Sequence, residues 1–361
     1  MNIKKTEFFK RNDSGSVDII LIGKNEGKLL EKSLLSAQKA AFLFESDGNP
    51  LPKIIYVDGQ STDGSVHLAK SLGVETYIVE GKPTPPAGRR LGFSKCHGKY
   101  VFFLDGDTIL HSEWLIHGIK YLEQNKTIAG VGGILDWEEL NSGEIIGKKS
   151  NYWNVSHDEE KVLDGVGGNF LYRRDVLDNV GGWQPAMSRN GEFELHLRIA
   201  HAGFSLARIS VPMAIHLDNK TKSSRTFVQR HILTSNIFIP GMITRRAPKS
   251  LPVLKLLFYR YWLYLLHPVA VLGILIFVFL YFHTQSMKWI IPGIIAAILL
   301  FICHYLYKGK DLKRAIISVI TMNFFSFGWL IGLFVQWPTG DDRTSINDES
   351  DERQLKMRFP N

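Results

Sequence analysis

Short apolar runs alternate with amphipathic segments over about the first 220 residues of the chain. Four runs that are rich in β-branched and aromatic residues are predicted to be buried strands: residues 17–22, 53–57, 75–79 and 100–104. The segments between them that we predict to be helical are residues 28–44, 65–72 and 87–96. Alternation of strand and helix is typical of α/β proteins, so we predict a mostly parallel sheet flanked by helices.

Three long apolar stretches occupy the later part of the chain: residues 261–282, 289–307 and 315–335. A membrane-spanning helix needs about 20 apolar residues, so the sequence predicts an all-α region with about three transmembrane helices. Residues 251–264 mix Lys255 and Arg260 with apolar residues. This segment is either a helix that lies in the membrane interface or the beginning of the first span.

The distribution of basic residues predicts the orientation in the membrane. Residues 308–314 contain four Lys or Arg residues, whereas residues 283–288 contain one. Positive loops stay in the cytoplasm, so we expect a multi-pass protein of the inner or plasma membrane with a cytoplasmic N-terminal domain and an external C-terminal tail. The predicted boundaries are a lead-in at 1–16, an α/β domain at 17–235, a membrane region at 246–335 and a polar tail at 336–361.

Composition and charge narrow the classes of partner. The 361 residues suffice for roughly two domains, and the formal net charge is +8. Basic residues are dense near the first apolar stretch: Arg245, Arg246, Lys249, Lys255 and Arg260. This cluster suits anionic membrane lipids, and the lack of a nucleic-acid-binding motif argues against nucleic acid as a partner. The two cysteines, Cys96 and Cys303, show no metal-binding spacing and no disulfide framework, which fits a reducing cytoplasm.

A pair of carboxylates, Asp105 and Asp107, follows the fourth predicted strand. Ligands of open α/β sheets bind beyond the carboxyl ends of the strands, and side chains two residues apart on a strand point to the same side. Two carboxylates in that place suit Mg²⁺ or Mn²⁺ carrying a diphosphate. The alternative is a simple acidic turn, because Asp-Gly-Asp is also common in turns. No Gly-x-Gly-x-x-Gly follows the first strand and no Gly-Lys-Ser/Thr loop occurs, which disfavours a dinucleotide or P-loop site.

Six motifs occur in the order in which one enzyme family has them. They are Lys24-Asn25-Glu26, the turn from Asp58 to Gly64, Asp105-Gly106-Asp107, residues 167–174, Val180-Gly181-Gly182-Trp183 and residues 191–198. Through these motifs, about residues 17–220 resemble a family 2 inverting glycosyltransferase of the GT-A fold. The resemblance implies transfer of a hexose from a nucleoside-diphosphate sugar to an acceptor hydroxyl, with inversion at the anomeric carbon.

The resemblance also implies roles on the donor side. Asp107 would be a direct metal ligand, and Asp105 would orient the ribose or a metal-bound water. Arg89 matches the arginine of the family's Ala-Arg-Asn-x-Gly helix and would bind phosphate through paired donors. Asp58 would contact the nucleoside. His216 follows the apolar strand predicted at residues 207–215 and would be a second metal ligand, since neutral imidazole suits Mn²⁺.

On the acceptor side, the resemblance implies a carboxylate that acts as general base. Glu192 falls at the position of the family's catalytic Asp, and the preceding Glu of the family motif is missing. Glu192 and Glu194 are about 200° apart on a helix, so only one can face the site, and Glu194 is the reserve candidate. Three further residues would line the acceptor side: Gly167, Gly168 and Asn169.

The membrane region and the motifs together predict a membrane-bound enzyme of polysaccharide biosynthesis that adds single sugars to a glycan, lipid or polyprenyl-linked acceptor. Processive synthases of the family carry Gln-x-x-Arg-Trp, whereas residues 229–232 read Gln-Arg-His-Ile. A polysaccharide synthase, a sugar nucleotidyltransferase and a non-catalytic membrane scaffold stay open as alternatives. A nucleotidyltransferase would need a Gly-rich triphosphate loop after the first strand, and a scaffold would tolerate loss of the acidic residues.

Overall fold

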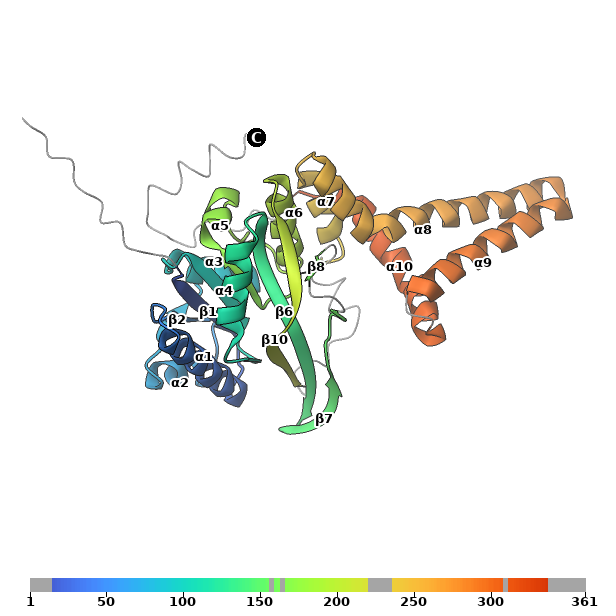
Figure 1. The fold of residues 1–361 in the computed structure, drawn as a ribbon. Coiled ribbons are helices and arrows are strands. Elements are labelled where there is room, and N and C mark those ends of the chain that lie inside the picture. Colours follow the sequence, from blue (N-terminus) through green and yellow to red (C-terminus); the bar gives the residue numbers. More distant parts are fainter. Residues whose placement is uncertain (1–14, 156–158, 163–165, 220–235, 308–310, 337–361) are drawn as a thin grey trace, which may run out of the picture. The chain divides into compact units, whose positions relative to one another are not determined.

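The computed structural model describes residues 15–155, 159–162, 166–219, 236–307 and 311–336. These residues form two compact units, one within 15–219 and one within 236–336 (Figure 1). The first unit contains the predicted α/β region and the second contains the predicted spans. The Gln-Arg-His-Ile segment lies outside the described residues, as do all but residues 15–16 of the expected lead-in at 1–16 and all but residue 336 of the expected tail at 336–361.

A mixed, mostly parallel sheet of ten strands forms the centre of the first unit. The strands are β1 (Val17–Gly23), β2 (Lys53–Asp58), β3 (Glu75–Ile78), β4 (Tyr100–Asp105), β5 (Thr108–Leu110), β6 (Ile128–Asn141), β7 (Glu144–Lys149), β8 (Glu159–Lys161), β9 (Phe170–Arg173) and β10 (Ser205–Asn219). Eight of them lie in the order β3-β2-β1-β4-β9-β6-β10-β5, while β7 pairs with β6 and β8 with β10. Strands β3, β2, β1 and β4 are parallel to one another, and β9 inserts antiparallel between β4 and β6.

Six helices flank this sheet: α1 (Lys28–Ser46), α2 (Ser65–Ser71), α3 (Pro85–Ser94), α4 (Trp114–Gln124), α5 (Arg174–Val180) and α6 (Gly191–His201). The four strands and three helices predicted before residue 105 are confirmed, with ends within two residues of the prediction. Helix α3 begins two residues earlier than predicted because Thr84 caps it. The Thr84 hydroxyl accepts a hydrogen bond from the amide of Ala87 at 3.1 Å, and prolines occupy the first helical positions.

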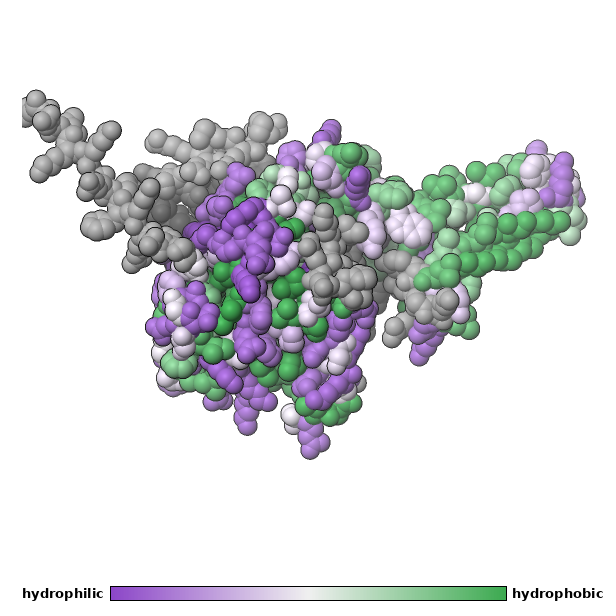
Figure 2. Space-filling model, viewed as in Figure 1, coloured by the Kyte–Doolittle hydropathy of each residue, from purple (hydrophilic) through white to green (hydrophobic). Residues whose placement is uncertain are grey.

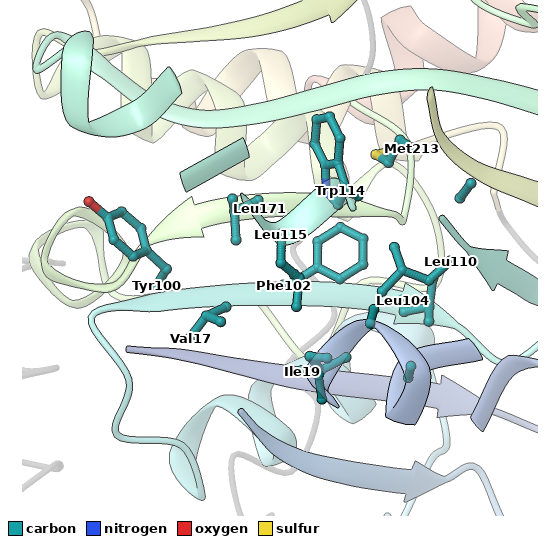
Figure 3. Close-up of a cluster of buried hydrophobic side chains, with 14 of the residues drawn as sticks. Val17, Ile19, Tyr100, Phe102, Leu104, Leu110, Trp114, Leu115, Leu171 and Met213 are labelled. Carbon is teal, nitrogen blue, oxygen red and sulfur yellow. The ribbon is translucent and has the colours of Figure 1, made fainter. Parts of the chain in front are cut away.

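Successive side chains of the central strands point to opposite faces of the sheet, and an apolar core lies on each face. On one face, Ile19 and Phe102 pack with α1 and with Trp114 of α4 (Figure 3). On the other face, Ile20 and Phe103 pack with α3, α5 and α6. Because strands β1 and β4 are buried on both faces, they read in the sequence as continuous apolar runs and not as alternating ones.

The second unit consists of helices: α7 (Ile239–Arg246), α8 (Leu251–Thr284), the 3₁₀ turn η3 (Met287–Trp289), α9 (Ile290–Tyr307) and α10 (Leu312–Gly332). Three helical segments in the described part of the chain are long and apolar enough to cross a membrane: residues 251–284, 287–306 and 315–332. Their most apolar windows have mean hydropathies of 2.5, 2.2 and 1.7. Much of the surface of α8 and α9 is hydrophobic (Figure 2). These helices indicate membrane association.

Helix α8 joins the segment at 251–264 to the first predicted span without a break. Its 34 residues correspond to about 51 Å, at 1.5 Å per residue. The hydrocarbon core of a bilayer is only about 30 Å thick, so a single helix of this length extends beyond it. The residues that carry Lys255 and Arg260 therefore have room to lie outside the hydrocarbon while the rest of the helix spans it.

Polar side chains connect the three long helices to one another. His267 of α8, His304 of α9 and Ser318 of α10 are all buried. The two histidine rings have centroids 5.3 Å apart, and His304 Nδ1 lies 3.0 Å from the Ser318 hydroxyl. Hydrogen bonds between helices in lipid contribute about 0.6–2 kcal/mol each, so this cluster helps to define how the three helices pack.

Candidate active site

The carboxyl ends of three parallel strands meet at one edge of the sheet. The β1–β2 register aligns Gly23 with Asp58, and the β1–β4 register aligns Ile22 with Asp105. The turn after β4 is tied to the end of β1, since the amide of Gly106 donates to the carbonyl of Ile22 at 2.7 Å. Asp58 and Asp105, two of the three carboxylates predicted for the donor side, therefore lie at the same edge, on strands separated only by β1.

Arg89 of α3 lies between two carboxylates at this edge. Its Nη2 donates to Asp105 Oδ1 and its Nη1 donates to Glu192 Oε1, both at 2.8 Å. The arginine side chain is only 3% exposed, and its guanidinium carbon lies 4.9 Å from the centroid of the Trp183 ring. Burial raises the pKa of the Asp105 carboxyl above its usual value, against the opposing effect of the Arg89 charge. The fold thus unites three residues from distant parts of the chain, all predicted to belong to the site.

Gly168 and Asn169, directly before β9, pack against Arg89 and Asp105. A Cβ at Gly168 would overlap Arg89 Nη2 and both carboxylate oxygens of Asp105, so any larger residue would have to displace these two side chains. The Asn169 side chain accepts from the amide of Asp105 at 2.7 Å and donates to Thr108 Oγ1 at 3.4 Å. Gly168 and Asn169 therefore lie directly beside the donor-side carboxylate.

Asp107 and His216 meet because β5 pairs antiparallel with β10. The register aligns Thr108 with His216, and the amide of Leu217 donates to the carbonyl of Asp107 at 2.8 Å. Asp107 Oδ1 lies 3.3 Å from His216 Nδ1, and the imidazole packs on Trp137 with ring centroids 4.2 Å apart. Burial disfavours the protonated imidazole, but the Asp107 carboxylate outweighs it and raises the pKa of His216. The two predicted metal ligands are therefore neighbours.

The side chains at this edge that can bind a metal ion suit a cation that is also bound by a substrate. Across the residues that the structure describes, no three His, Cys, Asp or Glu side chains are grouped closely enough to hold a metal ion by themselves. Asp107 and His216 supply one oxygen donor and one nitrogen donor. Mg²⁺ and Mn²⁺ are commonly held by one or two protein groups together with substrate phosphates and water. The pair therefore fits a metal–diphosphate site and does not fit a cage made of protein ligands alone.

The carboxylate of Asp58 is fully buried at the end of β2. Its Oδ1 accepts from the Tyr56 hydroxyl at 2.8 Å, and its Oδ2 accepts from the amide of Ser61 at 2.7 Å. The same turn is linked to the loop after β1, because Asn25 Oδ1 accepts from the amide of Thr62 at 2.7 Å. Asp58 thereby holds the shape of the turn that borders the donor side.

Glu194, the reserve candidate for the base, forms an ion pair with Arg198 and not with Arg89. Its carboxylate accepts from Arg198 Nε at 2.8 Å and from Nη2 at 2.6 Å. Arg198 also donates to the carbonyls of Val180 and Gly182. Arg198 thus joins α6 to the end of α5 and to the loop after it, with Glu194 as its partner on the same helix, whereas Glu192 joins α6 to Arg89. The expectation that only one of the two faces this cluster agrees with these contacts.

Two tryptophans of the site have no role in the sequence-based prediction. Trp183 belongs to the Val-Gly-Gly-Trp motif, which is a signal in the sequence, although the motif alone does not reveal its contact with Arg89. Trp137 lies in the long strand β6 and belongs to no motif that we recognised. Its contact with His216 follows from the parallel pairing of β6 with β10, which aligns these two residues.

Comparison with known proteins supports the reading of this region. The sequence model of glycosyl transferase family 2 matches residues 18–181. The glycosyltransferase AglE of Haloferax volcanii is 26% identical over 204 residues, which are 53% of this chain. The match spans 63% of the length of that relative.

Solved structures of two proteins are similar to the chain at low sequence identity. S. aureus TarS in complex with UDP has a TM-score of 0.48 and 13% identity, covering 67% of this chain and 69% of the other. GalNAc-T7 with UDP, GalNAc and Mn²⁺ has a TM-score of 0.45 and 15% identity, covering 58% of this chain and 45% of the other. The family match shows that residues 18–181 carry a glycosyltransferase family 2 domain, which is built around the mostly parallel sheet described above, and three long apolar helices follow it in the described part of the chain.

Proposed function

We propose that this protein transfers a sugar from a nucleoside-diphosphate sugar to an acceptor hydroxyl, with inversion of the anomeric configuration. The family match supports the reaction class. The observation that carries the proposal is the cluster in which Arg89 bridges Asp105 and Glu192, next to the Asp107–His216 pair. Together these residues provide a carboxylate for proton removal and a cation-binding pair for a diphosphate at one edge of the sheet.

Glu192 is the general base in this mechanism. The acceptor oxygen attacks the anomeric carbon from the face opposite the diphosphate, while the Glu192 carboxylate takes the proton of the acceptor hydroxyl. The bond from the anomeric carbon to the diphosphate oxygen breaks, and its electron pair leaves with the diphosphate. A single displacement of this kind inverts the configuration. Arg89 donates to Oε1 of Glu192, and in this mechanism Oε2 takes the transferred proton.

The remaining donor-side residues bind and orient the nucleotide sugar. Asp107 and His216 would hold Mg²⁺ or Mn²⁺, which supplies positive charge against the departing diphosphate when it is bound. Asp105 orients the ribose or a water of the site. Asp58 acts through the turn that it shapes beside the nucleoside. Gly168 and Asn169 keep the backbone close to Asp105, with Gly167 beside them toward the acceptor.

We further propose a membrane-embedded acceptor. The described part of the chain carries three helices long and apolar enough to span a bilayer, and the basic residues near the beginning of α8 suit anionic headgroups. A glycan linked to a polyprenyl or other lipid diphosphate would reach an enzyme anchored in this way. The absence of Gln-x-x-Arg-Trp at residues 229–232 favours addition of single sugars over polymer synthesis.

A panel of donors tests the reaction class. The full-length protein in detergent, with Mn²⁺, is incubated with UDP-, GDP- and dTDP-linked hexoses, and the release of nucleoside diphosphate is measured together with the melting temperature. We expect one donor to be hydrolysed slowly and to stabilise the protein, by about 2.7 kcal/mol at a hundred times its dissociation constant. The proposal is contradicted if no nucleotide sugar is turned over and none raises the melting temperature.

Labelling of single cysteines tests the orientation in the membrane. In a Cys303→Ala background, in which the remaining natural cysteine, Cys96, is fully buried, we expect Gln285→Cys to react with an impermeant maleimide in intact cells. The reason is that the loop before η3 is predicted to be external. Asp311→Cys, in the basic connection before α10, should react only after permeabilisation. The opposite pattern would put the GT-A domain outside the cell, away from cytoplasmic nucleotide sugars.

A further inference from the structure

Arg89 is buried and offers little accessible surface to a substrate. Its two terminal nitrogens donate to Asp105 and Glu192, and its side chain is 3% exposed. Its Nε is buried and has no hydrogen-bond partner among the described residues. A guanidinium that grips a phosphate normally presents paired N–H donors toward the ligand. Here the paired donors are already directed at the two carboxylates.

The surroundings of Arg89 hold it in this position. The guanidinium stacks on the fully buried ring of Trp183, which favours a cation over its face. Backbone at Gly168 closes another side, since a Cβ there would overlap Arg89. The neighbouring Arg90 donates to the carbonyl of Trp183 at 3.2 Å, which fixes the loop that carries the indole. A side chain confined on these sides is suited to fix the orientation of the groups it binds.

We propose that Arg89, stacked on Trp183, is a positioning residue that orients the base Glu192 relative to the donor-side carboxylate Asp105. Arg89 comes from α3, Asp105 from the end of β4 and Glu192 from the first turn of α6. The bridge is therefore a direct link between the element that carries the base and the strand that carries the donor site. This inference rests on the proposed function, and it replaces the phosphate contact expected for Arg89 from the family resemblance.

The replacement Arg89→Lys separates positioning from phosphate binding. Lysine keeps the charge but loses the planar fork that holds two carboxylates at once. We expect kcat to fall by about 10–100-fold, because small displacements of a catalytic group have effects of this order. The dissociation constant of the best donor from the panel should stay within about threefold of the wild-type value. Trp183→Phe should lower kcat in the same way but by a smaller factor. This variant replaces Arg89→Lys in the experiment if Arg89→Lys does not fold.

A double-variant cycle asks whether Arg89 acts through Glu192. If it does, Arg89→Lys in a Glu192→Gln background should lower kcat by less than about threefold further, because the base is already gone. The matched control is Arg198→Lys, which weakens the neighbouring ion pair on α6. This control should lower the melting temperature, leave kcat within about threefold, and combine with Glu192→Gln in an additive way.

Two results would overturn the inference. One is a weakened donor affinity in Arg89→Lys with kcat retained, which is the behaviour of a phosphate ligand. The other is full additivity of Arg89→Lys with Glu192→Gln, which is the behaviour of a residue that serves the fold alone. Failure of the proposed function looks different, because the wild-type protein would then turn over none of the nucleotide sugars in the panel.

Discussion

Replacement of Glu192 by glutamine is expected to lower turnover by about 10²–10⁴-fold, the usual contribution of a general base. Glutamine has nearly the same size and can still accept a hydrogen bond from Arg89 through its amide oxygen. It cannot take a proton from the acceptor hydroxyl. Donor affinity, measured by equilibrium binding of the best nucleotide sugar from the panel, should therefore change little while kcat falls.

Glu194→Gln is the matched control for this experiment. Glu194 lies on the same helix but pairs with the buried Arg198, so its replacement removes an ion pair that stabilises the fold. Leaving a buried partner poorly satisfied costs about 1–3 kcal/mol. We expect a lower melting temperature and nearly normal turnover at a temperature where the variant is folded. An inactive Glu194→Gln beside an active Glu192→Gln would reverse the assignment of the base.

Asp107→Asn is expected to abolish the dependence of nucleotide binding on Mn²⁺ and to lower turnover by on the order of 10²–10³-fold. An amide oxygen is a poor replacement for a carboxylate ligand, and the charge that a cation supplies at a leaving diphosphate is worth several kcal/mol. Titration calorimetry with UDP, GDP and dTDP, with and without Mn²⁺, measures the loss. Asp136→Asn is a suitable control, because Asp136 accepts a hydrogen bond from the amide of Asn151 on the neighbouring loop. A variant at position 107 with unchanged Mn²⁺ dependence would exclude this aspartate as a ligand.

The same site should depend on pH in a defined direction. His216 must be neutral to bind a cation, and the Asp107 carboxylate raises its pKa above the ordinary value for histidine. Protons therefore compete with the metal at pH values below this raised pKa. Mn²⁺-dependent binding should weaken as the pH falls through that value and level off above it. In His216→Gln this competition should be lost, whereas nucleotide binding without metal should be unaffected.

Local patterns were sufficient to predict the first half of the GT-A domain. The strands that end at Asp58 and Asp105 are short, apolar and buried on both faces, so each is visible as a continuous run. Because parallel strands have their carboxyl ends at one edge, the meeting of these two carboxylates was predictable as well. The helix before β4, α3, was predicted as well, but it begins and ends two residues earlier than expected, because Thr84 caps its beginning.

The second half of the sheet depends on pairing between distant segments. The strand predicted at 207–215 is β10, which is longer at both ends because it pairs with β6, β5 and β8 in turn. Strand β6 carries several glycines, among them Gly130 and Gly133, where side chains and backbone of other strands approach closely. Glycine weakens the local strand signal while the tertiary contacts require it. For this reason β6 and its hairpin partner β7 were not predicted.

The sequence predicted which residues gather at the site better than it predicted the contacts between them. The pairing of Asp107 with His216 agrees with the expectation that both bind one cation, because both positions follow recognisable apolar strands. The bridge from Arg89 to Glu192 joins residues 103 positions apart and depends on how α3 and α6 pack on the same face of the sheet. No pattern within either helix reveals this, and the same holds for the stacking of Trp183 on Arg89.

The anomeric configuration of the released sugar tests the central claim most directly. An α-linked sugar nucleotide from the panel, labelled with ¹³C at the anomeric carbon, is hydrolysed by the full-length protein with Mn²⁺ and followed by NMR before the product mutarotates. With Glu192 as base and a single displacement, the β-sugar should appear first, and Glu192→Gln should produce it about 10²–10⁴-fold more slowly. Appearance of the α-sugar first, or equal rates for the two proteins, would contradict the account.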